Sequence, residues 1–378
     1  MKVLIFILLA ATFSFGHTGK IRQPEDANIS SDFGAFANIS YRDEDIYPKG
    51  IERAQGYEDH GSPGEVYIEH LGIYYTKKIE KINFNFELNH HAWAEWTLNE
   101  LVEKANIGYY DENYGLELGR DYNNVSFMRE MIWGYGFIQM PLAIDSFFDQ
   151  TNVGDGVFAS YKIDRFTFRG DYAADQYAHK LRKTIRASYE YDTIKLISYY
   201  QQRSPVKNRV DFSAITHSHT HGSGCDQMTQ NELCMDNETS VFGLGTKVKL
   251  NNSYELVGEY IQYKSEGDIE TQQYKVSQNN TIHSTYLQLM STNEKFNYGL
   301  RGEYFWYNTI LDGPGATEVS SLMSLNTAIV PVNYLYTANI NYYFTKSQKI
   351  AFEIKKSNQD LAMRLNYSLD FRNIFKSY

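Results

Sequence analysis

Strict alternation of apolar and polar residues is the feature that most limits the fold of this sequence. From Ile82 to Trp96, apolar side chains occupy nearly every even position and mostly Asn and Glu the odd positions, with His90 as the exception. In a helix these residues would scatter around the axis, whereas in a strand they separate into an apolar and a polar face. The segment is therefore predicted to be a β-strand between two different environments.

The alternation returns along most of the chain. The sequence predicts sixteen strands, at 32–41, 64–76, 81–96, 113–120, 124–132, 156–163, 165–173, 182–191, 193–201, 240–250, 254–264, 281–291, 296–308, 332–344, 349–356 and 360–371. An even number of strands brings both ends of the chain to one side of a closed barrel, and about two strands fewer or more would also fit.

The expected connections between these strands are alternately short and long. Short polar turns are expected at 77–81, 163–165, 191–193, 251–253, 291–295 and 345–348. Longer loops are expected at 42–63, 97–112, 134–155, 202–239, 265–280 and 307–324. Short turns at one end and long loops at the other are the layout of an outer-membrane β-barrel.

Composition supports a barrel and excludes other classes. The 378 residues include 32 Tyr and 22 Phe, which suit a membrane–water boundary, and only 7 Pro, which interrupts strand pairing. A mean hydropathy of -0.49 excludes a bundle of transmembrane helices but not a barrel, whose strands turn every second residue toward water. The formal net charge of -10 argues against nucleic acid as a partner, because phosphate binding requires a basic surface.

The start of the chain has the pattern of an export signal. A short basic start precedes an apolar stretch at 3–11, which is too short to span a bilayer as a helix, and small residues follow up to Gly16. We therefore expect a signal peptide at 1–16 and a barrel domain at 17–378, with a buried N-terminal strand as the alternative. No later stretch approaches ~18 consecutive apolar residues, so no transmembrane helix is expected.

A soluble β-sandwich or jelly roll would also contain alternating strands and turns. Three features favour the membrane barrel: the aromatic load on the apolar faces, hairpins between sequence neighbours, and an aromatic residue, Phe371, at the end of the last strand. The predicted fold is thus an all-β, transmembrane, antiparallel up-and-down barrel.

The signal peptide, the sixteen strands and the long loop after the fifth strand together resemble the Gram-negative general porins, over the whole mature chain and without a short diagnostic motif. The resemblance implies an outer-membrane homotrimer, in contact with lipid and lipopolysaccharide, with its long loops extracellular and one loop folded into the lumen. Porins usually end on an aromatic residue. Here the chain continues to Tyr378, so either the last strand is longer or a short tail follows.

The resemblance places the lumen loop at about 134–155. Its far end is acidic and the strands after it carry arginine, so we expect an acidic loop to face a basic wall at the constriction. The charged candidates are Asp145, Asp149 and Asp155 in the loop, and Arg169, Arg186, Lys247, Arg301 and Arg364 on the wall. The alternative for each of them is a hydrated wall position, since a water-filled lumen tolerates charge.

Two further features lie in the predicted loop at 202–239. It holds the chain's two cysteines, Cys225 and Cys234, and an even count in an exported protein predicts a disulfide, with two free thiols as the alternative. His217, His219 and His221 alternate and would point the same way on an extended segment, which makes them weak metal-ligand candidates. Since no other ligand with suitable spacing adjoins them if the cysteines are bridged, we predict no metal and no cofactor.

The expected function is a water-filled channel for passive diffusion of small hydrophilic solutes and ions. The alternatives are a channel selective for an anion, a sugar or an organic acid, and an adhesin or receptor that acts through its loops. We expect no enzyme, because the motifs G-x-S-x-G and H-E-x-x-H and a phosphate-binding glycine loop are absent.

Overall fold

The computed structural model describes most of the predicted barrel domain. The described residues are 29–42, 66–91, 97–123, 125–127, 137–138, 140–148, 153–175, 180–211, 232–291, 293, 295–322, 333–345, 347–358 and 361–371. The proposed signal peptide, Cys225, the three alternating histidines, Asp149 and Tyr378 lie outside them. Among the described residues, no helix combines the length and the apolar character needed to cross a membrane.

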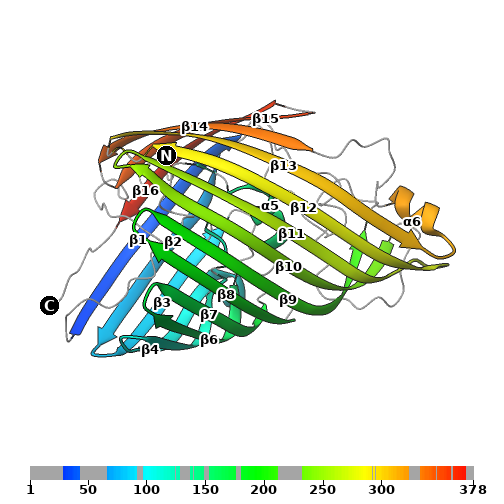
Figure 1. Cartoon of the computed structure of the whole chain (residues 1–378), viewed down its shortest axis with the longest axis horizontal. Helices are drawn as coiled ribbons and strands as arrows, with labels where there is room; N and C mark the ends of the chain where they lie inside the picture. The colour runs from blue at the N-terminus through cyan, green and yellow to red at the C-terminus, as the bar shows by residue number, and fades with distance from the viewer. Residues whose placement is uncertain are drawn as a thin grey trace.

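Sixteen antiparallel strands close into a single barrel, which confirms the predicted fold and strand count. Each strand pairs with its sequence neighbours, and β1 pairs with β16 to close the ring (Figure 1). The strands are β1 Ile29–Arg42, β2 Val66–Ile79, β3 Ile82–His91, β4 Val102–Tyr110, β5 Tyr114–Tyr122, β6 Val153–Ile163, β7 Phe166–Asp175, β8 Leu181–Tyr191, β9 Ile194–Asp211, β10 Glu232–Asn251, β11 Tyr254–Glu270, β12 Lys275–Ser291, β13 Phe296–Asp312, β14 Tyr334–Thr345, β15 Gln348–Ser357 and β16 Leu361–Phe371.

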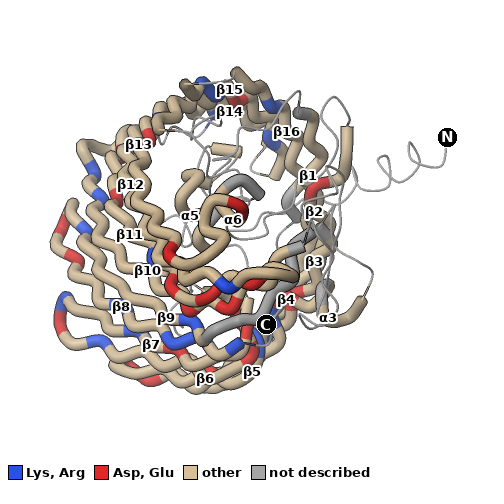
Figure 2. Tube along the Cα trace, turned by 90° about the vertical axis from the view of Figure 1, so that its right-hand side faces the viewer, with Lys and Arg blue, Asp and Glu red and all other residues tan. Residues whose placement is uncertain are grey.

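In the part of the chain that the structure describes, three short helices accompany the strands. They are α3 Leu98–Leu101, α5 Leu142–Phe148 and α6 Ala316–Leu322. α3 precedes β4, α5 belongs to the connection between β5 and β6, and α6 follows β13. Figure 2 shows α5 inside the ring of strands.

The predicted strand at 113–120 is present as β5, but the predicted strand at 124–132 is wrong and β4 was not predicted. The structure has β4 at Val102–Tyr110, inside a predicted loop, and β5 at Tyr114–Tyr122, while nothing described at 124–132 is a strand. The reason is local: β4 has only nine residues, and Ala105 weakens its outward apolar face. The long connection nevertheless follows the fifth strand, as predicted.

Short turns join the strands at one end of the barrel, which we call the short-turn end, and those after β2, β6, β8 and β10 have only two residues. Glu80, Asp164 and Asp192 open three of these turns with φ between 46° and 51°. Two-residue hairpins favour such left-handed backbone because it matches the twist of the strands. Next to one turn, Lys81 Nζ lies 2.8 Å from Asp111 Oδ1, and this contact raises the pKa of Lys81 and lowers the pKa of Asp111.

Alternation along each strand separates an apolar outer face from a mixed inner face. On β13, Leu300 is 58% exposed and faces outward, while its neighbour Arg301 is buried inside. The same outward positions carry large hydrophobic side chains on nearly every strand. A soluble protein would not expose a continuous apolar surface of this kind, so the outer face is that of a barrel surrounded by lipid.

Aromatic residues lie toward both ends of this apolar band. Tyr254 and Tyr298 contact each other near the short-turn end, with ring centroids 6.1 Å apart. Toward the other end, His283 stacks on Trp306 at 5.1 Å, and Tyr260 Oη lies 2.8 Å from His283 Nδ1. Such rings, apolar with a polar edge, mark the two membrane–water interfaces.

Leu300→Arg is expected to destabilise the barrel by about 2–4 kcal/mol, because it places a charge in the middle of the lipid-facing band. The matched control is Ile310→Arg, on the outer face of the same strand but beyond Trp306, where the expected cost is only about 0–1 kcal/mol. Urea unfolding in lipid vesicles measures both. Equal losses for the two variants would contradict the assignment of the lipid band.

Strands β10 to β13 continue beyond the aromatic row and form a separate extension of the wall (Figure 1). Leu233, Met235, Ile269 and Val276 on its inner side bury a second apolar cluster against Val319 of α6. The predicted loop at 265–280 is therefore wrong, since only 271–274 form a turn. Outside the bilayer a strand no longer needs an apolar outer face, so its alternation fades from the sequence.

Candidate functional site in the barrel lumen

The connection between β5 and β6 crosses the lumen. Its described residues, 123, 125–127, 137–138 and 140–148, are called the inner segment. Asn123 Nδ2 donates a hydrogen bond to Gln201 Oε1 of β9, four strands away around the ring. The backbone N–H of Phe127 donates to Glu259 Oε1 of β11 at 2.7 Å. The segment thus leaves β5 and reaches the far side of the barrel.

Two more carboxylates hold the middle of the inner segment. The backbone N–H of Ile138 donates to Glu353 Oε2 of β15 at 2.8 Å. The backbone N–H of Leu142, at the start of α5, donates to Glu303 Oε2 of β13 at 2.7 Å. Charge-assisted hydrogen bonds are stronger than neutral ones, so three wall glutamates fix the position of this backbone.

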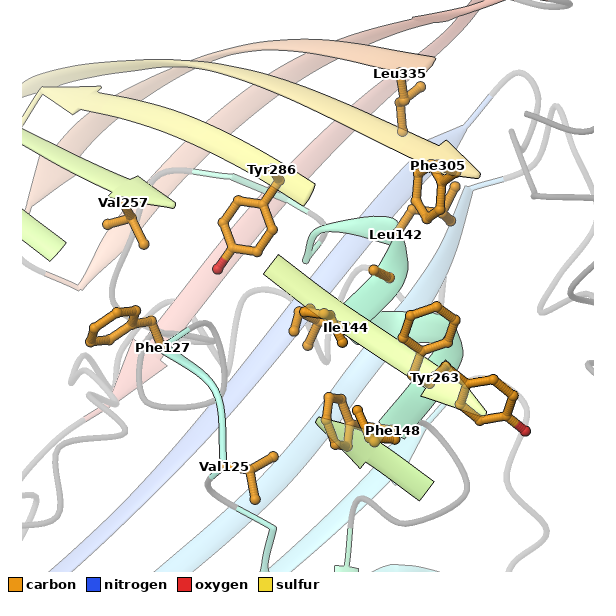
Figure 3. Packing of buried hydrophobic residues seen from close by; sticks show 14 of the residues in the cluster. Val125, Phe127, Leu142, Ile144, Phe148, Val257, Tyr263, Tyr286, Phe305 and Leu335 are labelled. Carbon is orange, nitrogen blue, oxygen red and sulfur yellow. The ribbon is translucent and has the colours of Figure 1, made fainter. Parts of the chain in front are cut away.

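An apolar core lies between the inner segment and the wall (Figure 3). From the segment, Phe127, Leu142, Ile144 and Phe148 enter this core. The phenyl ring of Phe147 stacks on Tyr263 of β11 with centroids 4.9 Å apart. The wall contributes Ile197, Tyr199, Val241, Val257, Ile261, Tyr263, Ile282, Tyr286, Met290, Phe305, Leu335 and Ala362. One side of the lumen is therefore filled as a close-packed protein interior is filled.

Arg301 contacts both polar and apolar groups of the inner segment. Its guanidinium bonds Glu303 Oε1 at 3.0 Å and the carbonyl oxygen of Met140 at 3.2 Å. It also lies over the ring of Phe137, 4.6 Å from the centroid. The side chain is fully buried, so these contacts compensate a charge removed from water.

The wall from β4 to β9 carries ion pairs on its inner face, although β9 also contacts the inner segment through Gln201 and Tyr199. Asp171 pairs with Arg182 at 3.0 Å, and Asp175 pairs with Arg203 at 2.5 Å. Asp121 contacts Lys104 at 2.9 Å and Arg169 at 3.8 Å. Ion pairs thus predominate on the inner wall from β4 to β9, whereas apolar packing against the inner segment predominates from β9 onward.

Tyrosine–carboxylate contacts continue these polar interactions toward β3. Tyr122 Oη lies 2.7 Å from Glu87 Oε1 and also contacts Glu103. Tyr110 Oη donates to Glu117. Glu87 and Glu117 fall on the polar faces of predicted strands, but Glu103 and Tyr110 were assigned to a loop. Glu103 lies at a register shift, since Glu87 pairs with Lys104 and Leu88 with Val102, and this irregularity breaks the alternation that would have revealed β4.

The predicted constriction residues do not come together as one site. Asp155, expected in the lumen loop, lies on the outward side of β6, where Val157 and Tyr161 also point. Its carboxylate binds Arg120 at 2.6 Å, and Arg120 also bonds the carbonyl oxygens of Asn99 and Val102. Asp155 therefore tethers the rim around α3 and does not face Arg169.

The predicted basic wall residues all lie on inner faces. Arg169 is directly opposite Arg186 on adjacent strands, and Lys247 pairs with Glu255 at 2.9 Å. Arg364 is buried opposite Glu353 in the β15–β16 register. Arg301, as described, holds the inner segment. Asp145 belongs to α5, and the direction of its side chain is outside the described part of the structure.

Within the described residues, no group of three or more His, Cys, Asp or Glu side chains could hold a metal ion. Cys234 is buried in β10 next to the second apolar cluster. Its predicted partner lies outside the described residues, so the disulfide stays a prediction.

A closed antiparallel ring with an apolar outer face and a segment packed inside defines the class: a transmembrane β-barrel of the outer-membrane type. Solved structures share this fold. OmpT, an outer membrane protein of Vibrio cholerae, aligns with a TM-score of 0.59 at 9% identity, over 92% of this chain and 98% of that chain. The outer membrane channel DcaP of Acinetobacter baumannii aligns at 0.55 and 10% identity, over 94% of this chain and 100% of that chain.

At such low identity the likeness establishes the fold alone. A trimer form of OmpT aligns similarly, with a TM-score of 0.57 and 7% identity, over 91% of this chain and 99% of that chain. No family model and no curated protein matches the sequence.

Proposed function

We propose that the protein is an outer-membrane channel for passive diffusion of small hydrophilic solutes and ions, and not an enzyme. The observation that carries the proposal is that charged side chains on the inner wall of β6 to β10, such as Lys162, Glu190 and Lys249, stay exposed inside the closed ring. Charged side chains line water-filled passages at little cost, whereas a dry barrel core would be apolar. A ring of sixteen strands is wide enough for such a passage.

The proposal includes the protein's setting. The short-turn end faces the periplasm and the extension of β10 to β13 faces the cell exterior, because outer-membrane barrels have short periplasmic turns. The trimer form of OmpT supports a homotrimer. Residues 1–16 act as a signal peptide, lipopolysaccharide surrounds the outer half, and Cys225 and Cys234 form a disulfide in the exported protein.

A role as adhesin or receptor is the second candidate. The extension of β10 to β13 with α6 favours it, because this part has its own apolar cluster and projects beyond the aromatic row. Conductance separates the two candidates, since a barrel that acts through its extension needs no open lumen.

Purified protein inserted into planar lipid bilayers is expected to produce discrete, nearly ohmic conductance steps. Liposomes containing it are expected to swell in isotonic solutions of small sugars or amino acids, at rates that fall with solute size. A heat-denatured sample of the same preparation is the control. Bilayers that stay silent with folded protein would overturn the channel proposal and favour the second candidate.

A further inference from the structure

A band of uncharged polar side chains lies between the two apolar clusters of the barrel. It occupies the inner face of the extension of β10 to β13, with the core around the inner segment on one side and the cluster beneath α6 on the other (Figure 1). Over this described stretch, the inward positions of the four strands include no Asp, Glu, Lys or Arg. The band, called the amide band, consists of Asn237, Thr239, Ser265, Gln278, Asn280 and Thr309.

The strand register brings the members of the amide band together around Gly267. Asn237 of β10 and Gln278 of β12 each pair with Gly267 of β11. Because glycine has no side chain, the two amides meet on the inner side of β11, where Asn237 Nδ2 donates a hydrogen bond to Gln278 Oε1 at 3.0 Å. In the next row, Thr309 Oγ1 donates to Asn280 Oδ1 at 2.7 Å. The band is thus a compact polar surface on four adjacent strands.

The amide band has more hydrogen-bonding groups than the described residues satisfy. Asn237 and Gln278 are 7% and 3% exposed, and within the described part of the chain Asn237 Oδ1 and Gln278 Nε2 have no hydrogen-bond partner. A buried polar atom without a partner destabilises a fold, so native proteins pair such atoms with protein, water or ligand. One acceptor and one donor side by side therefore point to an occupant that offers both kinds of group.

The amide band can be reached from the lumen. Thr239 and Thr309, at its edges, face inward and are partly exposed. Tyr263 and Tyr307 lie one row closer to the membrane, at the border of the apolar core. A few polar groups with apolar surface beside them are the usual composition of a site for a small molecule.

We infer that the amide band is a binding site for a small neutral sugar, inside the extension of β10 to β13. The inference rests on the proposed channel function for its substrate class, although binding itself needs no open lumen. Side-chain amides offer donors and acceptors and hydroxyls do both, so they match the hydroxyl groups of a sugar. An ion would lose its hydration at this surface without meeting an opposite charge.

The test is isothermal titration calorimetry on the full-length barrel in detergent micelles. Maltotriose is expected to bind the wild type with a millimolar dissociation constant, whereas trigalacturonate, of similar size but charged, is expected not to bind. Asn237→Leu/Gln278→Met keeps the volume but removes both amides, so it should weaken maltotriose binding roughly tenfold, as the loss of about two hydrogen bonds would. In planar bilayers, maltotriose added at the side of the extension should block the wild-type current more than maltotriose added at the short-turn side.

The matched control removes another buried amide pair from the inner wall, with Asn339→Leu/Asn341→Leu on β14, where Asn341 Nδ2 donates to Asn339 Oδ1 at 2.8 Å. It should keep the wild-type affinity. A wild type that does not bind maltotriose holds only water at the amide band, and this result would overturn the inference, whatever the fold of the variants. Equal losses of affinity in the two double variants would overturn it too. Sugar binding by a protein that leaves bilayers silent would support this inference and refute the channel instead.

Discussion

Arg301→Ala is expected to lower the free energy of unfolding by about 3–5 kcal/mol, because it leaves a buried carboxylate without its partner. Glu303 then loses the guanidinium at 3.0 Å, the Met140 carbonyl loses its donor, and Phe137 loses the cation above its ring. The inner segment should detach from β13. Limited proteolysis within residues 140–148 should become faster, and single-channel conductance should become larger and noisier.

Two variants make this prediction specific. Arg301→Lys keeps the charge but not the planar fork, so it should recover part of the stability. Arg182→Ala removes an equally buried arginine from the inner wall of β8, where its partner is Asp171. It should also destabilise the barrel but leave the inner segment resistant to protease. If Arg301→Ala and Arg182→Ala release the segment equally, Arg301 has no special role in holding it.

Phe148→Ala should cost about 3–5 kcal/mol of stability, the usual loss for deleting a buried phenyl ring. Phe148 is fully buried at the end of α5 and packs edge-on against Tyr199 with ring centroids 6.0 Å apart. Its removal leaves a cavity between α5 and β9 that the rigid barrel wall fills poorly. Urea unfolding in lipid vesicles, followed by circular dichroism, measures the loss.

The conservative variant Phe148→Leu should lose less than about 1.5 kcal/mol, because it keeps most of the volume. Single-channel recordings add a second measurement: Phe148→Ala should flicker more than Phe148→Leu. A loss below about 1 kcal/mol for Phe148→Ala would contradict the view that the apolar core anchors the inner segment.

The barrel was largely predictable because lipid imposes a simple rule on every spanning strand. Strands that do not follow this rule were not predicted correctly. The end of β11 beyond Lys264 has no lipid to face, so its residues were assigned to a loop. β4 is short and its outward face begins with Ala105, so its alternation carries little contrast.

The packed lumen was not predicted, although β11 contains a signal. Val257 and Ile261 fall on the same face as Glu255 and Glu259, so this strand is apolar on both faces. A strand that faces lipid outside and water inside has no reason to bury aliphatic residues inward. What covers them was not predictable, because the covering segment touches strands that are distant in the sequence and has no periodicity of its own.

The three wall glutamates that hold the inner segment also set the order of assembly. Their backbone partners precede them in the sequence by 132, 161 and 215 residues. The segment is synthesised before these strands, yet Glu353 of β15 can reach it only when the last strands join the ring. Such long closures are slow to form. We therefore expect the inner segment to reach its final structure late in folding, after the strands that enclose it have paired.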